Sequence, residues 1–451
     1  MPIKSVHITN YYHKNSGGIS TSYNNLLAAA ARHKRFISLI VPGKSEEIEQ
    51  VNDYAKIYYI PAKQSPVFDK RYRMIMPWQY MQPGRIREIL LDEKPDLIEV
   101  CDKYTLSMMG AMIRLGKFKQ LGRPLLVHFS CERMDDNIAS FLTKKPVGRS
   151  LARLVMGAYN FASFDFHIAN SAYTAQEFYD SIEAENSSAI SRRFLNFTWR
   201  FFKAPKVPAS ERIFVCPRGV DAERFNPNRR SDAVKKEMRA RAGVPEDATV
   251  LLYAGRISPE KNVELLVEMM EILAKDNEHD FRLLVAGAGP QSDWLREETA
   301  KRFPEKIVQF GHLDKELLAD YYANADVFVH PNPREPFGIA PLEAMASGVA
   351  TLAPNAGGIL SYATRENMWL VEPNANDFAD AVREIVEDKN LRDAKIAKAL
   401  ETVKQNTREI STDRLLATYD RIFADFQRRK ELFAYDEKPE NFDFAAELLN
   451  N

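Results

Sequence analysis

The chain has 451 residues with 62 basic and 62 acidic side chains, so its formal net charge at pH 7 is zero. This balance argues against nucleic acid as the main partner, and no apolar run approaches the ~18 residues that a membrane span needs. The three cysteines, Cys101, Cys131 and Cys216, lack metal-ligand spacing and predict neither a disulfide framework nor a zinc site. The sequence therefore indicates a soluble cytoplasmic protein of two or three domains.

The net charge of zero hides an asymmetry along the chain. Residues 1–208 contain 29 Lys and Arg against 19 Asp and Glu, and residues 209–451 carry the opposite balance. Such a difference suggests two domains with different partners, of which the first faces an anionic one. Pro205, Pro208 and Ser210 favour a linker at this point, and we therefore expect a first domain at residues 1–208.

The chain opens with a predicted strand at residues 3–9, followed by the pair Gly17 and Gly18 and a helix with apolar residues at helical spacing. Glycines between a strand and a helix allow the backbone to approach a ligand closely. A tight connection without a ligand is an equal alternative for this pair.

Further buried strands are predicted at residues 36–41 and 125–128. The last of them ends in His128 and is followed by Glu132 and Arg133. Open α/β sheets bind ligands at strand ends, which makes these three side chains candidates for a site. The alternatives are a structural histidine and a surface ion pair.

A second series of strands begins at residues 250–254 and leads directly to Arg256 and, five residues later, Lys261. In a loop that opens a helix, the arginine can fork onto phosphate oxygens while the lysine adds a point charge. The strand at residues 281–286 is followed by Gly287-Ala288-Gly289, which could indicate a dinucleotide site. The third glycine of that motif is missing and Pro290 follows, so the indication is weak.

The most informative stretch is residues 325–348, where a short strand, a Pro- and Gly-rich turn and a helix follow one another. The turn carries Glu335 and the helix carries Glu343. Free N–H groups at the start of a helix bind anions, and a carboxylate one turn inside it could accept two hydrogen bonds from a vicinal diol. The alternative is a pair of solvated glutamates.

These motifs and their order resemble the retaining glycosyltransferases of family 4, over about residues 3–430. The resemblance implies an α/β protein of the GT-B fold, with two doubly wound Rossmann-like domains that face a central cleft. It also implies a second domain at residues 209–415, which binds the nucleotide sugar, and a last helix, in about residues 416–451, that crosses back to the first domain.

The resemblance also implies roles for the motif residues. Arg256 and Lys261 would hold the donor pyrophosphate, Glu335 and His128 would lie at the donor sugar, and Glu343 would hold the ribose. Glu132 and Arg133 would lie on the acceptor side. The remaining donor-binding residues would be Gly17, Gly18, Phe337, Gly338, Ile339 and Ala340. Ser361 stands where the family often has an acid, which puts that contact in doubt.

The function implied is the retaining transfer of a hexosyl group from GDP-mannose or a UDP-hexose to a glycan or lipid-linked acceptor of the cell envelope. No Asp-x-Asp motif occurs in the sequence, so no essential metal and no cofactor are expected. A nucleotide-sugar epimerase, a phosphorylase and a non-catalytic nucleotide-sugar-binding subunit remain as alternatives. A nicotinamide oxidoreductase that uses Gly287 and Gly289 is a further one.

Residues 192–203 form one more distinctive segment. Wound at about 100° per residue, they place Arg192, Arg193, Arg200 and Lys203 on one arc and six large apolar residues on the rest. A basic stripe beside an aromatic face is typical of helices in a membrane interface. An anionic membrane surface, on the inner face of the membrane, is therefore a candidate partner. Internal packing of the aromatic face is an equal alternative.

Overall fold

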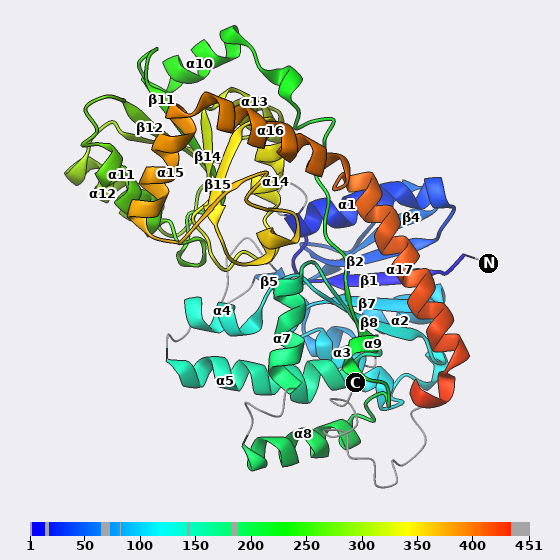
Figure 1. Cartoon of the computed structure of the whole chain (residues 1–451). Helices are drawn as coiled ribbons and strands as arrows, with labels where there is room; N and C mark the ends of the chain where they lie inside the picture. The colour runs from blue at the N-terminus through cyan, green and yellow to red at the C-terminus, as the bar shows by residue number, and fades with distance from the viewer. Residues whose placement is uncertain are drawn as a thin grey trace. The chain divides into compact units, whose positions relative to one another are not determined.

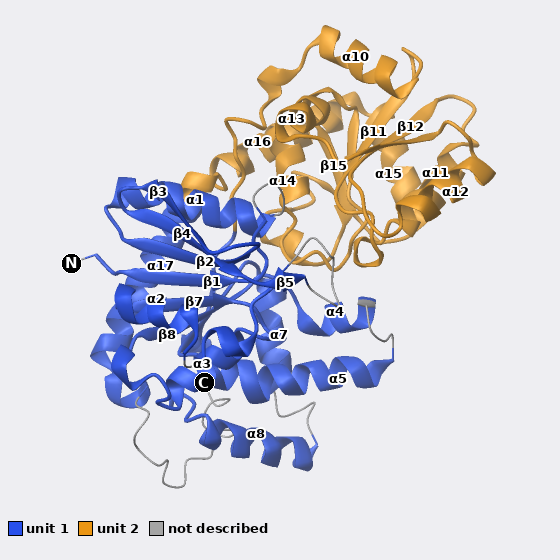
Figure 2. Ribbon diagram, turned by 180° about the vertical axis from the view of Figure 1, so that it is seen from behind, with its two compact units in different colours: residues 1–217, 411–451 blue, residues 218–410 orange. Residues whose placement is uncertain are grey.

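The protein, here a computed structural model, is described over residues 2–13, 18–64, 73–81, 83–141, 145–182 and 188–433. It divides into two compact units (Figures 1 and 2). Unit 1 comprises Met1–Pro217 with Ser411–Asn451, and unit 2 comprises Arg218–Ile410. None of the described helices combines the length and the apolar character that crossing a bilayer requires.

The boundary between the two units lies after Pro217, nine residues beyond the predicted end of the first domain at residue 208. Pro208 precedes the short helix α9 (Ala209–Arg212), which contains Ser210. The chain then enters β10 (Ile213–Val215), which pairs in parallel with β9 (Phe166–Ala169). Because β10 is the last strand of the first sheet, the chain leaves unit 1 only after Pro217.

Unit 1 contains an eight-stranded sheet with the order β10-β9-β8-β7-β1-β2-β4-β3, parallel except for β3. Its other strands are β1 (Ser5–Thr9), β2 (Ile37–Gly43), β3 (Glu47–Asn52), β4 (Ala55–Pro61), β7 (Leu97–Cys101) and β8 (Leu125–Ser130), and a separate hairpin consists of β5 (Lys63–Gln64) and β6 (Arg73–Met74). Its helices are α1 (Gly18–His33), η1 (Pro77–Gln79), α2 (Arg85–Glu93), α3 (Ser107–Arg114), η2 (Lys119–Leu121), α4 (Met134–Phe141), α5 (Pro146–Val155), the π-helical η3 (Met156–Asn160), α6 (Phe161–Ser163), α7 (Ala172–Ile182), α8 (Ala189–Phe201), α9 (Ala209–Arg212) and η8 (Lys430–Phe433).

Alternate residues of the unit 1 strands face opposite sides of this sheet, as the period of two requires. Leu39, Leu97 and Val127 pack on one side with α1 and with the last long helix, α17 (Arg408–Arg428). Ile40, Ile98 and Leu126 pack on the other side with α2 and α3. From Ser411 onward α17 belongs to unit 1, as expected for a last helix that returns to the first domain (Figure 2).

Unit 2 contains a six-stranded parallel sheet with the order β13-β12-β11-β14-β15-β16. Its strands are β11 (Thr249–Ala254), β12 (Phe281–Ala286), β13 (Ile307–Gly311), β14 (Val327–Val329), β15 (Ala350–Pro354) and β16 (Trp369–Val371). Its helices are η5 (Pro227–Arg229), α10 (Asp232–Ala242), η6 (Pro259–Lys261), α11 (Glu264–Leu273), α12 (Ser292–Arg302), α13 (Lys315–Asn324), α14 (Ile339–Ala346), η7 (Gly358–Ser361), α15 (Ala375–Glu387) and α16 (Lys389–Lys404).

Two apolar clusters cover the faces of the unit 2 sheet. Leu252, Leu284 and Phe328 pack with α13, α14 and α16, and Leu251, Leu283 and Val327 pack with α11 and α15. Because both faces are covered, the four central strands are buried along almost their whole length, and a ligand can be reached from their ends.

Candidate active site

The strand order of unit 2 fixes where a ligand can bind. From β11 the chain adds β12 and β13 on one side, then returns to place β14 on the other side. Doubly wound sheets bind ligands at the carboxyl ends of the two strands where the order reverses. The loops that follow these strands are residues 255–263, after β11, and residues 330–338, after β14. They carry Arg256, Lys261 and Glu335.

Lys261 and Glu335 join these two loops. The Lys261 Nζ donates to Glu335 Oε2 at 2.7 Å, and the Asn332 amide donates to the same oxygen at 3.0 Å. Burial raises the pKa of Glu335, but the charges of Lys261 and His330 outweigh it and hold that pKa at about 2. The carboxylate is therefore ionised and fixed in direction, with one oxygen occupied by these donors.

His330 completes this group from the end of β14. Its Nε2 lies 3.5 Å from Glu335 Oε2, and the side chain is buried. Burial lowers the pKa of His330 to about 4, so the ring is neutral at pH 7. A neutral ring beside an ionised glutamate leaves Lys261 as the cation of the group.

The loop with Arg256 is held in place by close backbone contacts. The Tyr253 hydroxyl donates to the Arg256 carbonyl at 2.8 Å. At Gly287, where φ is +154°, a Cβ would lie 1.8 Å from the Gly255 carbonyl oxygen, and at Gly289 it would lie 2.2 Å from that of Ile257. These two glycines therefore have a packing role, because their missing side chains make room for the turn that carries Arg256.

The helix after Glu335 begins at Ile339, with Gly338 as its N-cap in the left-handed region. Gly338 has no side chain to cap this end, and among the residues that the structure describes no side chain is recorded as an acceptor for the first N–H groups of the helix, those of Ile339 and Ala340. Phe337 is buried beneath them against Tyr362, with ring centroids 5.3 Å apart. A helix start of this kind favours a bound anion.

A second glycine pair supports this loop. The Gly358 N–H donates to the Glu335 carbonyl at 2.7 Å, and a Cβ at Gly358 would lie 1.9 Å from the Pro336 carbonyl oxygen. The Tyr362 hydroxyl donates to the Gly338 carbonyl. Ser361, at the position where an acid was considered, is exposed. This pair thus fixes the backbone that carries Glu335 and Gly338.

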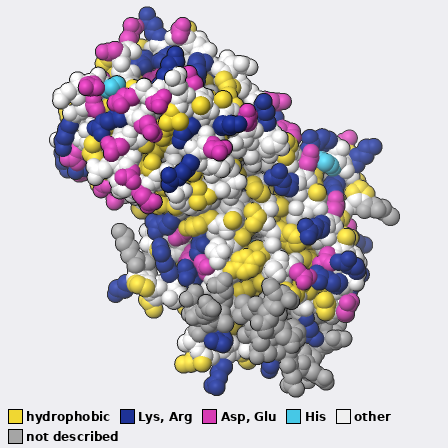
Figure 3. Space-filling model, viewed as in Figure 1, with side chains coloured by type: hydrophobic (Ala, Val, Ile, Leu, Met, Phe, Trp, Pro, Cys, Tyr) yellow, Lys and Arg dark blue, Asp and Glu magenta, His cyan; other side chains and the backbone are white. Residues whose placement is uncertain are grey.

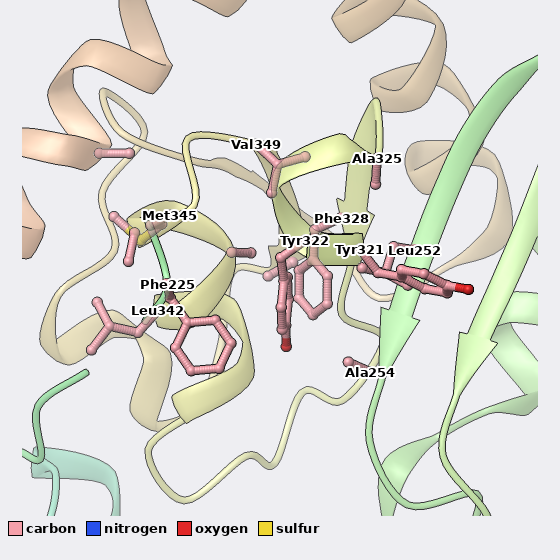
Figure 4. Packing of buried hydrophobic residues seen from close by; sticks show 14 of the residues in the cluster. Phe225, Leu252, Ala254, Tyr321, Tyr322, Ala325, Phe328, Leu342, Met345 and Val349 are labelled. Atoms are coloured by element: carbon pink, nitrogen blue, oxygen red, sulfur yellow. The ribbon is translucent and has the colours of Figure 1, made fainter. Parts of the chain in front are cut away.

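Glu343 lies inside α14 and accepts a hydrogen bond of 3.2 Å from the Tyr322 hydroxyl. Burial raises the pKa of Glu343 to about 7. Tyr322 is packed between Phe225 and Phe328, whose ring centroids lie 5.6 and 5.2 Å from its own (Figure 4). Glu343 therefore changes charge near neutral pH, unlike Glu335.

The predicted residues of unit 1 lie apart from these loops in the sequence and differ in accessibility. His128 is in the middle of β8, fully buried among Phe164, His167 and Phe178, and neither ring nitrogen has a hydrogen-bond partner in the part of the chain that is described. Burial lowers the pKa of His128 well below its usual range. Direct contact with a sugar would require the ring to become accessible, so that role stays a prediction.

Glu132 and Arg133 are both engaged in unit 1. Glu132 accepts a hydrogen bond of 2.9 Å from the Tyr11 hydroxyl. Arg133 donates to Asp135 and Asp180 at 2.9 and 2.8 Å, and only 6% of its surface is exposed. Arg133 thus belongs to a buried network of ion pairs. The sequence analysis had considered an ion pair for this residue, but at the surface.

Of the predicted glycine pair, Gly18 is the first residue of α1, and Gly17 lies outside the described residues. Several contributors to the site in unit 2 had no predicted role, namely Tyr253, Tyr322, His330, Asn332 and Tyr362. Asn332 could have been found, because it lies three residues before Glu335 in the same turn. Tyr322 and Tyr362 come from other elements, and no local motif points to them.

Within the described ranges, no group of three or more His, Cys, Asp and Glu side chains is arranged to hold a metal ion. The roles assigned to the individual site residues, and the independence of metal, stay predictions.

Comparison with known proteins finds a matching family model and similar sequences. A family model described as "Glycosyl transferases group 1" matches residues 234–402, most of unit 2. The "GDP-mannose-dependent alpha-(1-6)-phosphatidylinositol dimannoside mannosyltransferase" of Mycobacterium tuberculosis is 27% identical over 384 residues, which cover 85% of this chain and 88% of that protein. The "GDP-mannose-dependent alpha-mannosyltransferase" of Corynebacterium glutamicum is 25% identical over 432 residues, or 95% and 91% of the two chains.

Among solved structures, the sucrose-phosphate synthase from Thermosynechococcus elongatus superposes with a TM-score of 0.68 at 19% identity, covering 94% of this chain and 100% of that one. This likeness concerns the fold, which is the GT-B fold of two Rossmann-like α/β units. The family model shows that residues 234–402 are a group 1 glycosyltransferase domain, and the relatives, named as mannosyltransferases, are similar to this chain over most of its length, in agreement with the predicted resemblance to glycosyltransferase family 4.

Proposed function

We propose that this enzyme transfers a hexosyl group, with mannose as the first choice, from a nucleoside diphosphate sugar to a lipid-linked or glycan acceptor with retention of configuration. The observation that carries the proposal is the pair of loops at the switch point of the unit 2 sheet, where Lys261 donates to Glu335 and Arg256 lies on the same loop as Lys261. The names of the two relatives, both GDP-mannose-dependent mannosyltransferases, support GDP-mannose as the donor.

The donor diphosphate would bind Arg256, Lys261 and the uncapped start of α14. Breaking the anomeric C–O bond leaves its electron pair on a phosphate oxygen, and fixed cations and N–H dipoles stabilise this charge. The Lys261 Nζ already lies in the site, where it donates to Glu335 at 2.7 Å. These groups would do the work of a metal ion, so we propose a metal-independent reaction.

The two glutamates would bind different parts of the donor. Glu335, ionised and held by Lys261 and Asn332, would use its remaining oxygen to accept hydrogen bonds from sugar hydroxyls. Glu343, beside Tyr322, would accept from the two ribose hydroxyls. This division follows from their places, since Glu335 precedes the helix start that would hold the phosphates and Glu343 lies a turn beyond it.

For retention, the acceptor oxygen would bond to the anomeric carbon from the face that the diphosphate leaves. The acceptor proton would pass to the departing phosphate oxygen, so that one C–O bond breaks, one forms and the charges balance. No carboxylate nucleophile is required by this route.

A panel of GDP- and UDP-sugars, scored by thermal shift and by donor hydrolysis, tests the proposal. We expect GDP-mannose to give the largest shift and slow hydrolysis without an acceptor. Activity should persist in EDTA. Release of free nucleotide with epimerised sugar, or complete loss in EDTA restored by manganese, would contradict it.

A further inference from the structure

Helix α8 (Ala189–Phe201) carries a surface that the proposed transfer reaction does not use. One side of the helix is fixed to unit 1 through Leu195, Thr198 and Trp199, which are buried. The Trp199 indole donates to the Gly157 carbonyl at 2.7 Å, and the Leu195 side chain would lie 3.2 Å from a Cβ at Gly157. The helix is therefore a packed element of unit 1, with one of its sides committed.

The large apolar residues outside that side remain in solvent. Their exposed fractions are 79% for Ile190, 45% for Phe194, 65% for Phe197 and 55% for Phe201. The spacings of four, three and four residues align them in a single stripe along the helix. The aromatic face predicted from the sequence thus divides into a buried part and an exposed stripe, so neither of the two alternatives held for the whole face.

Basic residues line one flank of the stripe. At about 100° per residue, Arg192, Arg193 and Arg200 fall between the exposed stripe and the buried side. Lys203, which the sequence placed on the same arc, lies beyond the end of α8 with a positive φ of 52°, so the helical spacing does not extend to it. No acidic residue occurs in α8. Arg193 and Arg200 form no ion pair with any residue for which the structure gives a position.

Helix α5 (Pro146–Val155) shows a similar pattern. Val147, Leu151 and Val155 are 70%, 59% and 37% exposed, at intervals of four residues, and α5 also lacks acidic residues. It continues into η3, the segment that contains Gly157 and against which α8 packs. In Figure 3, the part of α8 that undescribed residues leave visible shows hydrophobic side chains next to Lys and Arg side chains.

We propose that α8 binds the surface of an anionic lipid bilayer, with the helix axis parallel to the membrane plane. Ile190, Phe194, Phe197 and Phe201 would enter the interface between headgroups and acyl chains, and Arg193 and Arg200 would contact lipid phosphates. A helix that presents an apolar stripe, a basic flank and no acid fits this partner by charge as well as by polarity. A second copy of the chain fits less well, because the same face on two molecules would bring arginines against arginines.

This proposal goes beyond the transfer reaction and needs no donor or acceptor, so the two can fail separately. The test is sedimentation of the full chain with vesicles of phosphatidylcholine alone or with about one third phosphatidylglycerol, at low and high salt. We expect binding only to the anionic vesicles, and release at high salt because exposed charges are then screened.

Two variants in α8 separate the contributions of charge and apolar contact. Arg193→Glu/Arg200→Glu should lower the partition coefficient by about tenfold or more, since each basic residue near an anionic surface contributes about fivefold. Phe197→Gln should lower it about fivefold. The matched controls are Lys236→Glu/Lys275→Glu, which reverses two exposed lysines of unit 2, and Phe36→Gln, which removes a ring of unit 1 that is 53% exposed.

The controls should bind within about twofold of wild type, and thermal melting should be unchanged in every variant, which establishes that each one folds. A wild-type protein that stays in the supernatant with anionic vesicles at low salt would overturn the proposal. So would equal loss of binding in the α8 and control variants. A concentration-dependent dimer that Phe197→Gln abolishes, without vesicle binding, would assign the stripe to contact between copies instead.

Discussion

The sheets of units 1 and 2 share the same strand order around the point where that order reverses. The side chains that follow the strands at this point differ between the two units. In unit 2 the loops after β11 and β14 meet through Lys261 and Glu335, a charged pair at 2.7 Å. In unit 1 the strand order reverses between β1 and β7. Asn10 follows β1 and Asp102 follows β7, and the Asn10 side-chain amide donates a hydrogen bond of 3.1 Å to the Asp102 carboxyl group. Burial raises the pKa of Asp102 to about 6.

The comparison shows that the sheet topology determines where a ligand can bind, whereas the side chains at that place determine which ligand binds. In both units the reversal of strand order brings two distant loops together at one edge of the sheet. Cations and a free helix start suit a diphosphate, as in unit 2, whereas amide and carboxyl groups suit sugar or polyol hydroxyls. On this account the affinity for the nucleoside diphosphate depends mainly on unit 2 residues.

The largest effect is expected from the cations of unit 2. Arg256→Ala or Lys261→Ala should lower turnover by about 10²–10³, the usual loss on removing one donor to transition-state charge. Steady-state rates with saturating donor provide the measurement, and Lys275→Ala, at a lysine with 76% of its side chain exposed, is the control. Wild-type rates in both variants would exclude these cations from the reaction.

Variants of the two glutamates should affect different quantities, nucleotide affinity in one case and turnover in the other. Glu343→Ala should weaken nucleoside diphosphate binding about tenfold, because the ribose loses two hydrogen bonds to a charged acceptor. Glu335→Ala should leave that binding within about twofold but reduce turnover about tenfold or more. Calorimetric titration with GDP and UDP, beside rate measurements, separates the two effects. Equal nucleotide affinity in both variants and wild type would refute this division of roles.

The pH dependence of nucleotide binding should follow Glu343. A carboxyl group whose pKa burial raises to about 7 is protonated below that pH and gains acceptor capacity as the pH rises. When the pH is lowered from 8 to 6, the affinity for the nucleotide should fall by up to about tenfold, because only about a tenth of a carboxyl group with a pKa of about 7 is ionised at pH 6. Glu343→Gln should keep only the weaker dependence that the phosphate of the ligand contributes, and an identical profile in wild type and variant would exclude Glu343 as the titrating group.

Tyr322→Phe should have the smallest effect. The variant keeps the ring between Phe225 and Phe328 but removes the hydrogen bond of 3.2 Å to Glu343. One hydrogen bond of about 1 kcal/mol corresponds to an approximately fivefold weaker nucleoside diphosphate complex. Thermal melting should change little, and unchanged affinity would show that Tyr322 does not support Glu343.

Most of the fold could be predicted from the sequence because its strands are continuous apolar runs and its helices have clear periodicity. The strand at residues 250–254, the turn with Glu335 and the helix at residues 340–346 correspond to β11, the loop after β14, and α14 (Ile339–Ala346). The glycosyltransferase family could be predicted as well, because its motifs are local and occur in order.

Features that depend on distant residues could not be predicted. The partner of Glu343 is Tyr322 on another helix, and the contacts of Gly287 and Gly358 are with backbone far away in sequence. The domain boundary depended on the pairing of β10 with β9, and the burial of His128 on three aromatic rings from other elements. In α8 the periodicity gave the amphipathic pattern, but only the packing on Gly157 decides which apolar residues stay exposed.

The most direct test of the account is calorimetric titration of GDP and UDP into wild type, Lys261→Ala and Tyr11→Phe. Tyr11→Phe is the matched variant in unit 1, where it removes the hydroxyl that donates to Glu132 at 2.9 Å. We predict that Lys261→Ala weakens the preferred nucleotide by about tenfold or more, the contribution of a hydrogen bond to a charged group. Tyr11→Phe should stay within about twofold of wild type. Unchanged binding in Lys261→Ala together with a large loss in Tyr11→Phe would contradict the assignment of the donor site to unit 2.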